Sequence, residues 1–93
     1  MSTIHRIYTE AKNERNIIEL ANTRFESFTV QPTFGYYKGK KEKSIVIEIV
    51  GPRSRSIQQL AQKIRHMNGQ SSVLMMKLSG TATLTRKTMQ RPR

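Results

Sequence analysis

The chain has 93 residues, with 17 lysines and arginines against six acidic residues, and its formal net charge is +11. A chain of this length forms one domain with a modest core, so association with other copies is an effective way to bury more surface. The absence of cysteine excludes disulfides, thiol catalysis and cysteine-based zinc sites. No apolar run approaches the ~18 residues of a membrane span and no signal-peptide core is present, so we expect a cytoplasmic protein without membrane association.

The first predicted elements are a strand over residues 4–8 and a helix that begins after Asn13. The segment IHRIY is short and rich in β-prone residues. Apolar residues then recur at helical spacing, at Ile17, Leu20, Ala21 and Phe25.

Residues 28–37 alternate in the manner of a strand. Phe28, Val30, Phe34 and Tyr36 share one face, in register with Pro32, and Thr29, Gln31, Thr33 and Tyr37 share the other. Because Pro32 cannot donate to a ladder, this strand is expected at a sheet edge or with a bulge. Residues 38–43 are predicted as a turn around Gly39, and residues 44–50 as the next strand.

A second helix follows Gly51-Pro52, with Ser54 or Ser56 as its predicted cap; Ser56 and Gln59 fit a capping box. The best helical stripe in the chain is formed by Ile57, Leu60, Ala61 and Ile64. Asn68-Gly69 is typical of a helix end.

The predicted order is strand, helix, hairpin, helix, strand. Residues 73–78 form the last main strand, whereas residues 81–93 are expected as a short extra strand or a basic tail. This order is βαββαβ, so we predict an α+β, ferredoxin-like domain over residues 1–80, with both helices on one face of an antiparallel sheet. The opposite face would stay open unless another copy covers it, which favours a homo-oligomer.

Residues for catalysis are scarce. There is no aspartate, the histidines at 5 and 66 are far apart, and no glycine-rich phosphate loop occurs. We therefore expect a non-enzymatic protein with no catalytic residues, no metal site and no cofactor.

The excess positive charge predicts contact with nucleic acid or another polyanion. Candidate contacts fall in a hairpin group with one tyrosine, a helix start and the tail: Lys38, Lys40, Lys41, Lys43 and Tyr37; Arg53 and Arg55; Arg86, Lys87 and Arg91. Lysines at a hairpin tip also suit a solvated turn, and the helix start also suits capping serines with solvated arginines. An RNA-recognition motif shares this topology, but residues 44–50 carry no base-stacking aromatic, and Glu48 would repel phosphate.

The string FGYYKGKKEKSIVIEIV and the later NGQSSVL resemble a group of small uncharacterised proteins from bacteria and bacteriophages, over residues 4–78. The matching positions are Gly35, Tyr36, Lys38, Gly39, Glu42, Ser44, Glu48, Asn68, Gln70, Val73 and Leu74. Tyr37 and Ser71 depart from the tryptophan and glutamate common in that group. The resemblance implies a ferredoxin-like domain, similar in outline to PII-type signalling proteins, without an established activity. Tyr36, Glu48 and Gln70 could then meet at one cleft, as a ligand site or a subunit contact.

Three functions remain open from the sequence. The first is a phage or bacterial protein that contacts nucleic acid through the basic hairpin, the helix start and the tail. The second is a PII-like oligomeric binder of a small anionic ligand such as a nucleotide. The third is a protein-interaction module that targets an acidic host protein.

Overall fold

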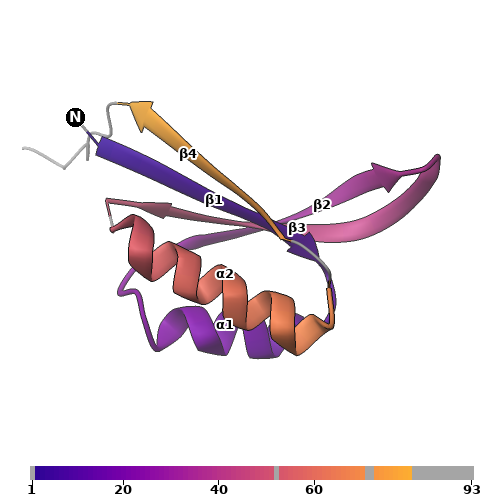
Figure 1. Ribbon diagram of the computed structural model, residues 1–93, viewed down its shortest axis with the longest axis horizontal. Helices are drawn as coiled ribbons and strands as arrows, with labels where there is room; N and C mark the ends of the chain where they lie inside the picture. Colours follow the sequence, from indigo (N-terminus) through magenta and orange to yellow (C-terminus); the bar gives the residue numbers. More distant parts are fainter. Residues whose placement is uncertain (1, 52, 71–72, 81–93) are drawn as a thin grey trace, which may run out of the picture.

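In the computed structural model, two helices cover one face of a four-stranded antiparallel sheet (Figure 1). The structure describes residues 2–51, 53–70 and 73–80, so the predicted tail with Arg86, Lys87 and Arg91 lies outside the described residues. The elements are β1 (Ser2–Glu10), α1 (Glu14–Asn22), β2 (Thr29–Tyr37), β3 (Lys40–Val50), α2 (Ser54–Asn68) and β4 (Leu74–Gly80). The strand order is β2-β3-β1-β4, which confirms the predicted ferredoxin-like α+β fold.

The core lies between the sheet and the helices. Alternate residues of the two central strands point into it and meet the apolar stripes of both helices: Ile7, Ile45, Ile47 and Ile49 from the strands, and Ile17, Ala21, Ile57, Leu60, Ala61 and Ile64 from the helices. Burial of each isoleucine or leucine contributes about 1.5–3 kcal/mol. Within the part of the chain that the structure describes, no helix is long and apolar enough to cross a membrane.

The hairpin between β2 and β3 is tighter than predicted. Only Lys38 and Gly39 form the turn, with φ values of 50° and 79°. Two residues with positive φ match the geometry of a type I′ turn, whose twist suits the flanking strands. The six-residue turn was therefore wrong, and Lys40, Lys41 and Lys43 belong to β3. β2 is an edge strand, as Pro32 predicted.

The two ends of α2 differ in how well the sequence predicts them. The N-cap is Arg53, without a side-chain cap, so the capping role of Ser54 or Ser56 was wrong. The Oγ of Ser54 instead lies 3.3 Å from Nε2 of His5 on β1. At the other end, Gly69 takes φ 64° and closes the helix, as predicted.

The second sheet face, which we call the open face, lies away from both helices (Figure 1). Val50, Leu74 and Met76 are exposed on it, and Val46 is half-buried. At its centre, Nε of Arg6 donates to Oε2 of Glu48 at 2.7 Å. This hydrogen bond raises the pKa of Arg6 above its ordinary value, and Tyr8 adds a smaller effect in the same direction. Around this charge pair, the face exposes apolar side chains from β4 and from the end of β3.

Candidate ligand site at the end of strand β1

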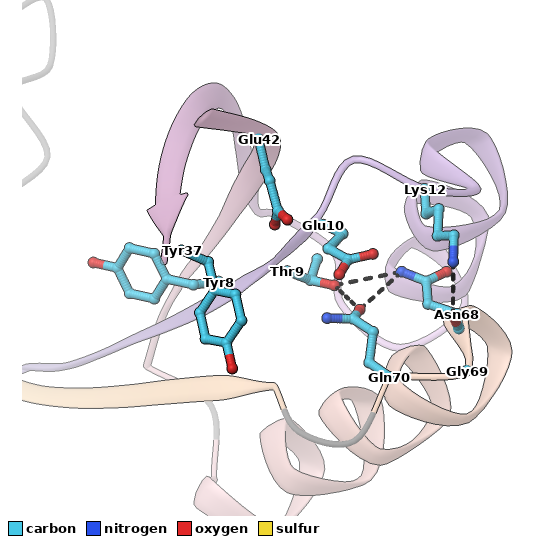
Figure 2. Close-up of a pocket in the computed structure, with 9 residues that line it drawn as sticks. All are labelled: Tyr8, Thr9, Glu10, Lys12, Tyr37, Glu42, Asn68, Gly69 and Gln70. Carbon is cyan, nitrogen blue, oxygen red and sulfur yellow. Dashed lines mark hydrogen bonds between the residues drawn. The ribbon is translucent and has the colours of Figure 1, made fainter. Parts of the chain in front are cut away.

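A depression of about 520 Å³ lies at the C-terminal end of β1 (Figure 2). We call this depression the β1 site. Three parts of the chain form it: the end of β1 with the following loop, the β2–β3 hairpin, and the C-terminal end of α2. The register of β1 with β4 stops at Tyr8 and Leu74, whereas β1 itself continues to Glu10. Among the described residues, the end of β1 therefore extends past its partner strand.

A hydrogen-bonded group of polar side chains, two of them buried, forms one wall of this depression. Thr9 and Asn68 are only 3% and 5% exposed. Oγ1 of Thr9 donates to Oε1 of Gln70 at 2.6 Å, and Nδ2 of Asn68 donates to the same oxygen at 3.1 Å. Nδ2 of Asn13 donates to Oδ1 of Asn68 at 3.1 Å, and Nζ of Lys12 donates to the backbone oxygen of Asn68 at 3.4 Å. These bonds tie β1, the β1–α1 loop and the end of α2 into one rigid support.

Aromatic and acidic side chains complete the lining. In Figure 2 the rings of Tyr8 and Tyr37 lie on one side and the Asn68–Gln70 group lies on the other, with Glu10 beside that group and Glu42 on the hairpin above. The described lining contains two carboxylates and one ammonium group, from Lys12. The depression is therefore locally acidic, although the chain has a net charge of +11. It offers flat apolar surfaces for a ring and acceptors for hydroxyl or amine groups.

Of the three residues predicted to share a cleft, only Gln70 lines this depression. Strand alternation places Tyr36 on the helix side of the hairpin and Glu48 on the open face, where it pairs with Arg6. Within one chain, the structure does not bring the three together. Tyr37, assigned from the sequence to nucleic-acid contact, takes the aromatic position instead.

Within the part of the chain that the structure describes, the residues predicted to contact nucleic acid form two separate groups. The hairpin lysines are exposed, and Nζ of Lys41 and Lys38 lie 4.2 and 5.4 Å from the ring centroids of Phe34 and Tyr37. Arg53 and Arg55 are exposed at the start of α2, at the opposite end of β3 from the turn (Figure 1). The two groups do not make one surface, and their binding role stays a prediction.

Several residues of the depression were missed by the sequence reasoning: Tyr8, Thr9, Glu10, Lys12, Glu42 and Asn68. The first strand was expected to end at residue 8, which left Thr9 and Glu10 in a loop. Asn68 was interpreted as part of a helix end and as a position that matches the resemblance, but not as a site residue. The available signal for a longer strand was that Thr9 and Glu10 continue the alternation of the preceding segment IHRIY. Among the described residues, no group of three or more histidine or acidic side chains could hold a metal ion.

Comparison with protein-family models and with curated proteins finds no match. Solved structures do share the fold. A DUF3240-family protein from Shewanella baltica aligns with a TM-score of 0.69 and 9% identity, over 92% of this chain and 97% of that chain. The Bacillus subtilis GlnK–ATP complex aligns with a TM-score of 0.58 and 17% identity, over 83% and 81%.

A phage SAM lyase in complex with S-methyl-5'-thioadenosine is similar to the same degree. Its TM-score is 0.57 and its identity 18%, over 83% of this chain and 80% of that chain. At these identities the likeness establishes the fold alone. It places the chain among small ferredoxin-like structures of PII-like outline, as the sequence resemblance implied.

Proposed function

We propose that this protein is a PII-like, self-associating binder of a small adenosine-containing ligand, which it holds at the depression beside the end of β1. The observation that carries the proposal is the lining of that depression, where two tyrosine rings and two carboxylates face a rigid amide wall. The fold supports it, because two similar structures are complexes with ATP and S-methyl-5'-thioadenosine, and both of these molecules contain adenosine.

The side chains suit the parts of an adenosine group. A purine can stack on the ring of Tyr8 or Tyr37. A carboxylate such as Glu10 or Glu42 can accept hydrogen bonds from ribose hydroxyls, as acidic residues do in dinucleotide sites. Because these carboxylates would repel a phosphate chain, the nucleoside part is expected to anchor the ligand, and Lys12 is the cation in the lining that a phosphate would meet.

Self-association belongs to the same proposal. The depression is open on one side, and Tyr8 and Tyr37 belong to the strand face that points away from the helices. That face also exposes Val50, Leu74 and Met76. A second copy packed there would bury these apolar side chains and would close the depression at the same time.

Catalysis is not part of this proposal: the protein is expected to bind its ligand and release it unchanged. The check is chromatography of S-adenosylmethionine and S-methyl-5'-thioadenosine after prolonged incubation with the protein. Conversion of either compound, absent in a Glu10→Gln/Glu42→Gln variant, would replace the binding function by an enzymatic one.

The binding test is thermal unfolding with adenosine, S-methyl-5'-thioadenosine, S-adenosylmethionine, ATP and GTP. A ligand at about 100 times its Kd stabilises the folded state by about 2.7 kcal/mol. At least one adenosine compound should raise Tm, and GTP should not. Tyr37→Ala should reduce the rise in Tm, because it removes one of the two rings that line the depression.

The matched control is Tyr36→Ala. Tyr36 and Tyr37 are adjacent and similarly exposed, at 72% and 63%, but they lie on opposite faces of the hairpin. Tyr36→Ala should keep the ligand-induced rise in Tm. No rise with any adenosine compound, or equal loss in both variants, would refute the proposed site.

A further inference from the structure

A second depression lies on the helix layer, on the other side of the sheet from the open face. Its volume is about 820 Å³, and its lining comes from the segment after α1, from the solvent-facing side of α2 and from β4. Three of its side chains are cations, Arg24, Arg55 and Lys63, and its described lining contains no carboxylate. We call this depression the α2 groove.

The glutamines of the α2 groove reinforce its preference for anions. Oε1 of Gln59 accepts a hydrogen bond from Nη1 of Arg24 at 3.2 Å. Oε1 of Gln62 accepts one from Nε of Arg65 at 3.0 Å. Because their oxygens are engaged, these amides offer a ligand their N–H groups. The groove therefore presents ammonium, guanidinium and amide donors together.

Two cations and the glutamine between them form a row along the helix. Arg55, Gln59 and Lys63 are spaced at i, i+4 and i+8, so they lie along one side of α2. At 1.5 Å per residue, the row is about 12 Å long. Since one strand of a nucleic acid advances about 3.4 Å per phosphate in a duplex and can extend further when single, the row spans about three phosphates.

Helix stability does not explain this arrangement. The first turn of α2 holds Arg55 and no acidic residue, although the positive end of a helix dipole disfavours a cation by about 0.3–1 kcal/mol. Across its 15 residues, SRSIQQLAQKIRHMN, the helix contains no acidic side chain that could pair with its arginines and lysine. The same features that cost stability favour a negatively charged ligand.

We propose that the α2 groove binds the phosphate backbone of single-stranded nucleic acid. A lone nucleotide would meet only one end of this row. A duplex is stiff, with a persistence length of about 50 nm, so it cannot curve into the groove between the segment after α1 and β4. A single strand can follow the row, with its phosphates at the cations. The groove shares no residue with the depression at the end of β1, so either proposal can fail without the other.

The test is fluorescence polarisation of a labelled oligothymidylate and of a labelled duplex over a salt series, with the full chain. The variant Arg55→Gln/Lys63→Gln removes two cations of the groove. The matched control Lys40→Gln/Lys41→Gln removes two from the hairpin, so both variants have the same net charge and all four residues are exposed.

The wild type should bind the single strand more tightly than the duplex. The groove variant should lose roughly tenfold or more in affinity. Its plot of log K against log salt should become shallower by about 1.4, since each lost phosphate contact on a single strand contributes about 0.7 to the slope. The hairpin variant should lose much less. A second variant, Gln58→Glu, keeps every cation but places a carboxylate in the groove, and it should weaken binding as well.

Three results would overturn the proposal. Equal losses in the groove and hairpin variants would show that the net charge of the chain acts without a site. Unchanged binding in the groove variant would exclude the groove. Tighter binding of the duplex would show that another surface is used.

Discussion

Asn68 is the residue on which the wall of the β1 site depends. It is 5% exposed, and its side chain contacts Thr9, Asn13 and Gln70. Asn68→Ala should lower the free energy of unfolding by about 2 kcal/mol, because it removes the three hydrogen bonds that this buried side chain makes. Urea unfolding measures the change. The control is Asn22→Ala at the exposed end of α1, which should change stability by less than about 0.5 kcal/mol. Equal effects would contradict the role given to Asn68.

His5 should make stability depend on pH. It is 2% exposed, its Nδ1 has no hydrogen-bond partner among the described residues, and burial, with a smaller effect from Lys77, lowers its pKa from the ordinary value. In the unfolded chain a histidine takes up a proton near pH 6.5, whereas folded His5 does so only at lower pH. The unfolded state therefore binds more protons between the two pKa values, and stability decreases as pH falls below about 6.5.

Chemical unfolding at a series of pH values tests this dependence. His5→Gln should flatten the decrease in stability between about pH 6.5 and the lower pKa of folded His5. His66→Gln removes the exposed histidine of α2 and should leave the decrease as in the wild type. A decrease that survives His5→Gln in full would assign it to other groups.

At the scale of elements, the β2–β3 turn is strained at one residue. Lys38 takes φ 50°, a conformation that asparagine adopts more readily than lysine. Lys38→Asn should raise the free energy of unfolding by about 0.5 kcal/mol, and Gly39→Ala, at φ 79°, should lower it by about 1–2 kcal/mol. In thermal unfolding, the Lys38→Asn variant should have the highest Tm, the wild type the next and the Gly39→Ala variant the lowest. Any other order would show that the turn changes its conformation.

The elements could be predicted from the sequence because each has its own local pattern. The stripe of α2, Ile57 to Ile64, is contained in eight residues, and the alternation of residues 28–37 indicated both the strand and its faces. Caps and ends were less predictable, since Ser54 could equally cap a helix or contact a distant histidine. The local sequence does not determine which of these two contacts Ser54 makes. The packing of β1 against α2 determines it.

The β1 site could not be predicted in the same way. Its side chains come from the end of β1, from the hairpin and from the end of α2, and no motif joins residues so far apart in the chain. The sequence resemblance did identify Gln70, but it paired this residue with Tyr36 and Glu48. Which of the neighbours Tyr36 and Tyr37 reaches the site depends on the face of the hairpin on which each lies. Adjacent residues of a strand point to opposite sides of the sheet, so an error of one residue moves the side chain away from the site.

At the scale of the whole molecule, two kinds of contact should respond to salt in opposite ways. A net charge of +11 repels a second copy, and salt screens that repulsion. Apolar contact across the open sheet face should therefore strengthen as salt rises. Binding of nucleic acid in the α2 groove should weaken, because bound counterions are released with each phosphate contact.

Light scattering after gel filtration measures the first of these effects. The mass should exceed the 10.8 kDa of one chain, and at low salt it should move toward that value. Leu74→Glu, on the open face, should give the single-chain mass at every salt concentration. Phe34→Glu is the control, because Phe34 is similarly exposed, 54% against 59%, but lies on the helix side of the hairpin. If Phe34→Glu dissociated the assembly and Leu74→Glu did not, the interface would lie on the hairpin, and the β1 site would have to bind its ligand without a second copy.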